Sequence, residues 1–506
     1  MKKTFISIGS LVLITLTLAF VLRTYGINSL LFFGNDQGQD ATIVTNMLSS
    51  ADGVFVGTET SASRFIYLGP LFYYVIAPLY AFGHGNPIYP AVFLILMSTL
   101  SLYLIFRVTR LMFGTTASLI ALTLTSFSYY MIFFSRWLSN TNLIVLLSAL
   151  LIFSMYQIMA TSERVWWLST SLLAGLSFHF QAASGFFYLF VLAIFMFWQR
   201  KEGMSFTTAI YMFLVFISTF IPEIIYDFNN QHIISREIIK YISNDTFGIS
   251  SSGIIHSRLL FFKEFFGTLL LPEKLSLAFP AILLLATVFV FKFKELSQNR
   301  YFGIPVIFMT VLFVGSFLFK DHIMHYYFSG FFVPFFMLVS VILAHLTRSK
   351  SGMVITVLSI LILVTINMKV TIGYLNQDPD SPYEVSYKNK KDAMSWIAQD
   401  YRDSQIDIRV FAPDESSTTL DYGQEYKYLL QSHGVSWGNR KSDCSPGDSL
   451  VPKEQLDSNV FYVIREYDHE QDDSLGNWIN CNGLDQNSLL VARQFGGLTV
   501  EKMTIK

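Results

Sequence analysis

Two carboxylates, Asp36 and Asp40, lie four residues apart just after the first apolar run, in the stretch Phe33-Gly-Asn-Asp-Gln-Gly-Gln-Asp-Ala. Carboxylates are capable of acid, base and hydrogen-bonding roles. Ionisable groups beside a bilayer are costly to keep, so they indicate a functional site by default. The plainer interpretation is that Asp36 caps a short surface helix and that Asp40 is solvated.

Other polar side chains with the same capabilities gather near the ends of apolar runs that we assign to the outer membrane face. They are Arg64, Tyr67, Tyr73, Arg136, Asn140, Asn142, His179, Gln181, Glu223, Asp227, His325 and Tyr326. Several also have a plainer interpretation. Arg136 can anchor the chain at lipid headgroups, and His179 and Glu223 can be structural residues at helix ends. The His325-Tyr-Tyr run can belong to an interfacial aromatic belt.

The composition predicts a membrane protein. Of 506 residues, 52% are hydrophobic and only 14% are charged, whereas about 25% of the residues of a soluble domain are charged. A net charge of −1 without a basic stripe gives no indication of nucleic-acid binding. The opening Met-Lys-Lys and apolar run resemble a signal peptide, but no small-residue cleavage site follows, so we interpret the run as an uncleaved first span.

Eleven apolar runs approach the roughly 20 residues that a spanning helix needs. They are Thr4–Leu22, Pro87–Phe106, Thr116–Phe134, Leu143–Met159, Trp166–Phe180, Ser184–Trp198, Phe206–Ile225, Leu277–Phe293, Ile304–Phe319, Tyr326–Leu346 and Met353–Met368. A twelfth, Tyr67–Phe82, is short and contains two prolines. Basic residues accumulate in cytoplasmic loops only if Tyr67–Phe82 does not cross. We therefore predict eleven crossings, a cytoplasmic N-terminus, and a juxtamembrane or re-entrant helix at Tyr67–Phe82.

The chain from residue 373 onward is polar and predicts a small extracytoplasmic α/β domain (373–506) after a transmembrane domain (1–372). Ile406–Phe411 and Val460–Ile464 are typical of buried strands, while Asp392–Tyr401 and Gln424–Leu430 are typical of helices. The cysteines, Cys444 and Cys481, can pair on the outer face or remain two free thiols.

The motifs resemble the bacterial glycosyltransferases of the C superfamily, which are related to protein O-mannosyltransferases and lipid A aminoarabinose transferases. The similarity covers about residues 1–370. It rests on the acidic stretch, on Tyr67-Leu-Gly-Pro-Leu-Phe-Tyr-Tyr, on Ser135-Arg-Trp-x-x-Asn-x-Asn, on Pro222-Glu-x-x-Tyr-Asp and on His325-Tyr-Tyr.

This resemblance implies a polytopic cell-membrane enzyme that takes sugar from a polyprenyl-phosphate donor. The acceptor would be a lipid, glycan or protein at the outer face. Asp36 matches the expected catalytic base. Asp40 matches a position where many relatives also carry an Asp, which makes it a weaker candidate. A cation such as Arg64 or Arg136 would stabilise the departing phosphate, and in-line attack predicts inversion at C1. No cofactor is implied, although a divalent metal is compatible with the chemistry.

Two positions depart from the pattern of the relatives. Many carry His or Lys just before the proline of the Tyr67 segment, whereas this chain has Leu68-Gly69, so Arg64 or a residue elsewhere must act there. Some place a second acid after the Arg136 position, where this chain has Asn140 and Asn142. The alternatives are a polyprenyl-lipid or glycan transporter or flippase, which would have polar groups at mid-bilayer, and a non-catalytic glycan-binding membrane scaffold.

Overall fold

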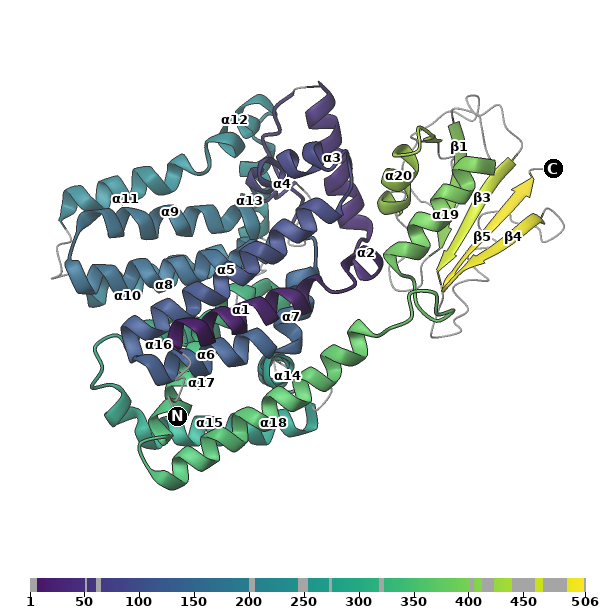
Figure 1. The fold of residues 1–506 in the computed structure, drawn as a ribbon. Helices are drawn as coiled ribbons and strands as arrows, with labels where there is room; N and C mark the ends of the chain where they lie inside the picture. Colours follow the sequence, from purple (N-terminus) through teal and green to yellow (C-terminus); the bar gives the residue numbers. More distant parts are fainter. Residues whose placement is uncertain are drawn as a thin grey trace. The chain divides into compact units, whose positions relative to one another are not determined.

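The computed structural model divides into two compact units (Figure 1). The described residues are 7–50, 52–60, 65–199, 205–243, 254–272, 275–317, 323–400, 405–411, 423–438, 460–466 and 489–504. Unit 1 comprises Met1–Tyr25, Gly53–Ile76 and Val92–Gly373, and unit 2 comprises Gly26–Asp52, Ala77–Ala91 and Tyr374–Lys506. Two short N-terminal segments thus cluster with the C-terminal part, and the two domains divided at residue 373 stay a prediction.

Each of the eleven predicted apolar runs contains a helix. These helices are α1 (Ile8–Thr24), α5 (Ile88–Phe113), α6 (Thr115–Phe127) with α7 (Tyr129–Arg136), α8 (Ile144–Thr161), α9 (Arg164–Phe180), α10 (Ala182–Trp198), α11 (Phe206–Ser218) with α12 (Ile221–Asn229), α15 (Leu275–Leu296), α16 (Gly303–Ser316), α17 (Phe332–Leu346) and α18 (Lys350–Leu375). In the described part of the chain, four helices are long and apolar enough to span a membrane, or six if each bent pair is one span. Eleven crossings and the orientation stay predictions.

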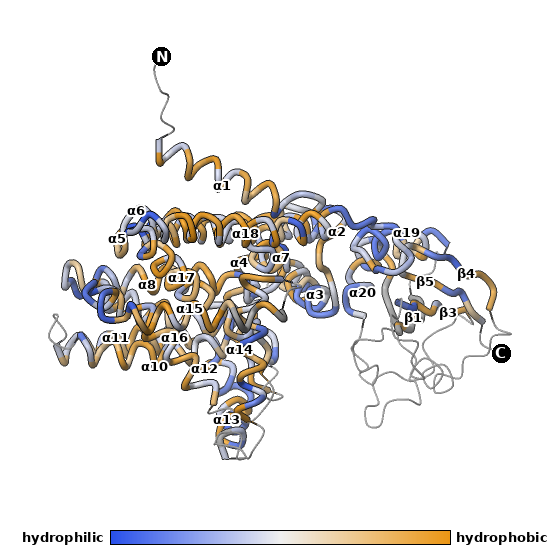
Figure 2. Tube along the Cα trace, turned by 90° about the horizontal axis from the view of Figure 1, so that it is seen from below, coloured by the Kyte–Doolittle hydropathy of each residue, from blue (hydrophilic) through white to orange (hydrophobic). Residues whose placement is uncertain are grey.

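Helix α9 packs between α8, α10 and α11 in unit 1 (Figure 1). Helices α8, α10 and α11 are predominantly hydrophobic (Figure 2). The segment Tyr67–Phe82 contains α4 (Leu71–Phe82), whose 12 residues are fewer than the roughly 20 that a span needs. The predicted loop Tyr226–Lys274 contains two further helices, α13 (Ile233–Ser243) and α14 (Ile254–Leu270). Sequence reasoning missed α14 because its charged residues lower the mean hydropathy of the segment.

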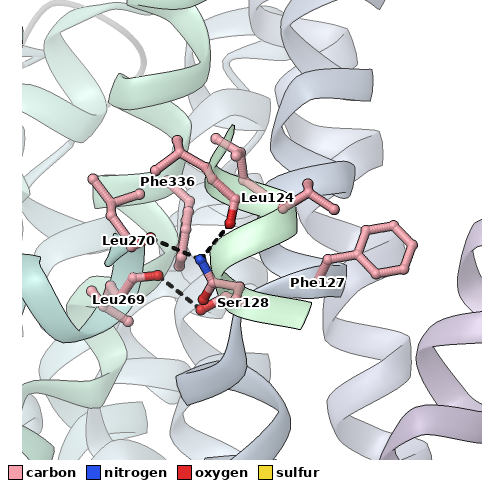
Figure 3. Close-up of a pocket in the computed structure, with 9 residues that line it drawn as sticks. Leu124, Phe127, Ser128, Leu269, Leu270 and Phe336 are labelled. Atoms are coloured by element: carbon pink, nitrogen blue, oxygen red, sulfur yellow. Dashed lines mark hydrogen bonds between the residues drawn. The ribbon is translucent and has the colours of Figure 1, made fainter. Parts of the chain in front are cut away.

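The junction between α6 and α7, bent by 58°, is tied to α14 and α18 by hydrogen bonds of Ser128, in the junction itself, and of Asn367 in α18. A broken helix exposes backbone groups, which need partners in an apolar surrounding. Ser128 Oγ donates to the Leu269 carbonyl, and Asn367 Nδ2 donates to the Leu270 carbonyl, both at 2.8 Å (Figure 3). Asn367 Oδ1 accepts from Tyr129 N at 2.8 Å. The cavity beside these residues, of about 10 Å³, has room for one water molecule only. We therefore interpret the junction as a structural feature and not as a ligand site.

Unit 2 contains a five-stranded mixed sheet in the order β2-β1-β3-β5-β4. Its strands are β1 (Gln405–Phe411), β2 (Ser436–Gly438), β3 (Val460–Glu466), β4 (Leu489–Phe495) and β5 (Leu498–Thr504). β1 pairs in parallel with β2 and β3, while β5 is antiparallel to β3 and β4. Helix α19 (Tyr387–Asp400) packs on β4 and β5 (Figure 1), and α20 (Gln424–Gln431) packs on β2. These elements confirm the predicted strands and helices of the tail.

Two short helices, α2 (Ile27–Leu30) and α3 (Asn35–Ser50), belong to unit 2. Helix α3 is strongly polar in comparison with the apolar helices (Figure 2). It packs closely on α20. The acidic stretch therefore forms a helix that is held by the C-terminal part of the chain. Cys444 and Cys481 lie outside the described residues, so their pairing stays open.

Candidate active site

Asp36 lies in the first turn of α3. Gln37 reaches back so that its Oε1 accepts from Gly34 N at 3.0 Å, as the third residue of a capping box does. This leaves the Asp36 carboxylate uncommitted, because within the described residues no hydrogen bond or ion pair engages it. The residue reaches the surface, yet burial of its carboxyl group by nearby protein raises its pKa above 3.8. A solvent-accessible carboxylate of raised pKa suits a general base.

Asp40 lies one turn further along α3 and is only 7% exposed. It lies near Tyr80 of α4, within unit 2. Burial raises the pKa of Tyr80 well above its ordinary value, and Tyr428 and Asp40 raise it further. The expectation that Asp40 is solvated as a plain surface residue is therefore wrong. Its proposed role in binding substrate stays a prediction.

Helix α3 is fixed to α20 by Gly38 and Asn35. A Cβ on Gly38 would overlap with the backbone of Gln424 and Glu425, so only glycine permits this approach. Asn35 Oδ1 accepts from Gln424 N at 3.0 Å at the start of α20. Sequence reasoning missed both residues, although a lone glycine within a helical pattern is a known signal of close packing.

The first loop of unit 1 forms a small hairpin ahead of α4. Gly57 N donates to the Leu68 carbonyl at 2.7 Å, and Leu68 N donates to the Thr58 carbonyl at 2.9 Å. Glu59 and Tyr67 form an antiparallel bridge. The buried Tyr73 of α4 lies with its hydroxyl 3.2 Å from Thr58 Oγ1. The hairpin thereby orients Tyr67 and the residues that follow it.

His179, at the end of α9, contacts the hairpin at Gly69. A Cβ on Gly69 would overlap with the imidazole ring. The Nε2 atom lies 2.8 Å from the Thr219 carbonyl, and because a carbonyl only accepts, Nε2 carries the proton. The other ring nitrogen, Nδ1, lies 3.8 Å from Glu223 Oε1 of α12. Two of the predicted binding residues are thus brought face to face.

Tyr67 lies beside this pair. Its ring meets that of Tyr226 edge to face, with centroids 5.8 Å apart. Tyr226 lies three residues after Glu223, on the same face of α12. Burial raises the pKa of Tyr67 to about 12, and Tyr226 and Glu59 contribute to this rise. The hydroxyl therefore remains protonated near neutral pH and can donate a hydrogen bond.

Arg136, at the end of α7, is buried and caps a neighbouring helix. Its Nη1 donates to the carbonyls of Arg23 and Tyr25 at 2.9 and 2.7 Å, at the C-terminal end of α1. Arg23 in turn donates from Nη1 and Nη2 to Ser126 and Thr125 at the end of α6. Cations stabilise helix C-termini through the macrodipole. Arg136 of α7 thus caps α1, and Arg23 of α1 caps α6, so the headgroup-anchor interpretation of Arg136 is wrong.

We expect Arg136→Met to destabilise the protein by about 3 kcal/mol, because two charge-assisted hydrogen bonds are lost at buried carbonyls. Thermal unfolding in detergent measures this effect. Arg110→Met, at an exposed arginine, provides the control and should leave the unfolding temperature unchanged. An unchanged unfolding temperature in Arg136→Met with weaker donor binding would instead indicate a substrate-binding role.

The remaining predicted residues take local roles in unit 1. Asn142 Nδ2 donates to the Ser135 carbonyl at 2.9 Å, and Asn140 Oδ1 accepts from Ser139 Oγ at 2.9 Å.

Asp227 of α12 also has a local role. Its Oδ1 accepts from Ile234 N and Ser235 N, and these bonds fix the end of α12 to the start of α13. Gln181 is buried between the end of α9 and the start of α10, and the ring of Tyr326 meets that of Trp137 edge to face. Arg64 and the side chain of His325 lie outside the described part.

Residues 68–226 match a family model described as dolichyl-phosphate-mannose-protein mannosyltransferase. The fold is similar to that of ArnT from Cupriavidus metallidurans bound to undecaprenyl phosphate, with a TM-score of 0.62, 12% identity and 98% of each chain covered. No curated protein sequence matches the chain.

Archaeal structures show the same likeness. The oligosaccharyltransferase of Archaeoglobus fulgidus, in complex with zinc and sulfate, matches with a TM-score of 0.57 and 11% identity, over 96% of this chain and 71% of that chain. AglB from Archaeoglobus fulgidus, in complex with an inhibitory peptide and a dolichol-phosphate, matches with a TM-score of 0.53 and 11% identity, over 84% and 64%. The predicted resemblance to the C superfamily of membrane glycosyltransferases is confirmed.

Proposed function

We propose that this chain, a membrane protein with the fold of the C-superfamily glycosyltransferases, moves a sugar from a polyprenyl-phosphate donor to a lipid, glycan or protein acceptor at the outer face. The observation that carries the proposal is the uncommitted, solvent-accessible carboxylate of Asp36 in the first turn of α3. Similar solved structures hold undecaprenyl phosphate or a dolichol-phosphate, which supports a donor of this chemical class.

The proposed reaction is a single displacement at C1 of the sugar. The acceptor oxygen forms the new bond to C1 while the bond from C1 to the phosphate oxygen breaks. Asp36 takes the acceptor proton, and the polyprenyl phosphate leaves with the bonding electron pair. A phosphate leaving group needs no protonation, so one carboxylate suffices where glycoside hydrolysis uses two. Attack opposite the leaving group inverts the configuration at C1.

The test is transfer by the purified full chain. We expect radiolabel to move from a polyprenyl-phosphate sugar to a component of membrane extract, in a reaction that needs both the donor and the protein. The donors are undecaprenyl phosphate carrying mannose, glucose, galactose, N-acetylglucosamine or an aminopentose. Absence of transfer from every donor by a folded protein, with movement of the intact lipid between leaflets of a vesicle, would support a flippase instead.

A further inference from the structure

The chain that leads into α3 contacts two tyrosines of the C-terminal part of unit 2. The buried ring of Phe33 meets that of Tyr387 in α19 edge to face, with centroids 5.7 Å apart. The centroid of the Phe33 ring also lies 6.0 Å from that of Tyr428 in α20. The contacts of α3 with the start of α20, described above, follow directly in the sequence. Asp36 lies between these contact points, so its position depends on where α20 begins.

The start of α20 is itself fixed by a buried ion pair. Glu425, in the first turn of α20, is 1% exposed, and Lys390 of α19 is 8% exposed. Lys390 Nζ donates to Glu425 Oε1 at 2.8 Å and lies 3.1 Å from Glu466 Oε1 of β3. The same ammonium group lies 4.9 Å from the centroid of the Tyr426 ring, whose hydroxyl donates to Glu466. One lysine thus links α19, α20 and β3.

The chemistry of the pair suits it to fixing a position. Burial lowers the pKa of Lys390, but Glu425 and Glu466 raise that pKa above its ordinary value, so the lysine is protonated at neutral pH. Within the described residues, Glu425 Oε2 has no hydrogen-bond partner, so this carboxylate depends on Lys390 for compensation of its charge. A buried ion pair adds little net stability in comparison with apolar side chains of similar size, but in some proteins it fixes one arrangement of the elements that it joins.

We propose that Lys390 and Glu425 position Asp36 for proton transfer, because they hold the start of α20 on which α3 rests. A Cβ on Gly38 would overlap with the backbone of Glu425, so a shift of Glu425 is transmitted directly to α3. A shift of about 1 Å can cost about 10²-fold in rate. This inference rests on the proposed function, because it takes Asp36 to be the base. Lys390 and Glu425 are positioning residues, which act through α3 and not on the substrate.

A matched pair of variants at Glu425 tests this inference in the full chain. Glu425→Gln and Glu425→Met both remove the carboxylate charge and keep the length of the side chain, but only glutamine keeps an oxygen that accepts from Lys390. Neither variant leaves Lys390 without an anionic partner, because Glu466 remains. With the labelled lipid that the wild type prefers, we expect Glu425→Met to lower kcat by about tenfold or more, with KM for the donor unchanged. Glu425→Gln should keep the wild-type kcat.

Amide hydrogen exchange provides a measurement that does not depend on sugar transfer. We expect the backbone amides of α3 to exchange about tenfold faster in Glu425→Met than in the wild type, because α3 loses a fixed support. The amides of β3 and β5 should keep their wild-type rates. Lys390→Met is a second variant and should show the same fall in kcat. Lys388→Met, in the same helix, is the control, because it removes only a surface ion pair with Asp380 and should change neither quantity.

Three outcomes would overturn the inference. Wild-type kcat in Glu425→Met, or equal losses of kcat in Glu425→Met and Glu425→Gln, would show that the bond to Lys390 does not position the base. A higher KM with unchanged kcat would assign the pair to lipid binding. A Glu425→Met protein that does not fold, or that exchanges faster throughout unit 2 with unchanged kcat per folded molecule, would indicate a role in the fold only. A wild-type protein that transfers no sugar would instead overturn the proposed function, while the exchange of α3 would still show whether the pair supports that helix.

Discussion

Asp36→Asn should reduce glycosyl transfer by about 10²- to 10⁴-fold, the usual contribution of a positioned general base. Asparagine keeps the size of the side chain but cannot accept the acceptor proton. The substitution should leave the unfolding temperature nearly unchanged, because no hydrogen bond or ion pair engages the carboxylate in the described part of the chain. Initial rates at saturating donor, measured with the labelled lipid that the wild type prefers, provide the comparison.

The pH dependence of the rate is an independent test of the role of Asp36 as the base. A base acts in its ionised form, so the wild-type rate should rise with pH through the pKa of Asp36. Since burial raises that pKa, the rise should lie above pH 3.8, the ordinary value for aspartate. The residual activity of Asp36→Asn should lack this rise.

Asp52→Asn is the matched control, because Asp52 is an exposed carboxylate of the same segment. We expect its rate and its pH profile to equal those of the wild type. A folded Asp36→Asn protein that transfers sugar at the wild-type rate would show that another group takes the proton. Asp36 would then have only a structural role in the first turn of α3.

Gly38→Ala should destabilise unit 2 by about 3 kcal/mol, at the upper end of the usual cost of overpacking. The added methyl group would overlap with the backbone of α20, which cannot rotate away as a side chain could. Helix α3 must therefore move, and Asp36 moves with it. A displacement of about 1 Å can cost about 10²-fold in rate, so we expect a loss of that size in protein that remains folded at low temperature.

Thermal unfolding and transfer rates in parallel separate the two effects of Gly38→Ala. The control is Gly373→Ala in α18, where no heavy atom lies within 4 Å of the added group. Alanine also favours a helix more than glycine does, so this variant should be at least as stable as the wild type. Wild-type stability and rate in Gly38→Ala would mean that α3 does not rest on α20 at this position.

The sequence predicts the apolar helices well because their cause is local. A run of apolar residues long enough for a bilayer forms a helix wherever it lies in the chain, and each of the eleven runs contains one. Helix α14 escaped this reasoning because Arg258, Lys263 and Glu264 lower its mean hydropathy. Its aromatic face is nevertheless buried, and Arg258 Nε donates to the Ser316 carbonyl at 2.9 Å.

By itself, the sequence determined the helical membrane class, the strands of the tail and the polar residues that merit testing, because periodicity, run length and motif order are properties of neighbouring residues. Only the tertiary structure decided which of those residues meet. Arg136 caps α1, Asn367 of α18 donates to the end of α14, and His179 fills the space that Gly69 leaves and faces Glu223. These contacts join residues far apart in the chain, and helix packing fixes them through side-chain shape, which no local pattern records.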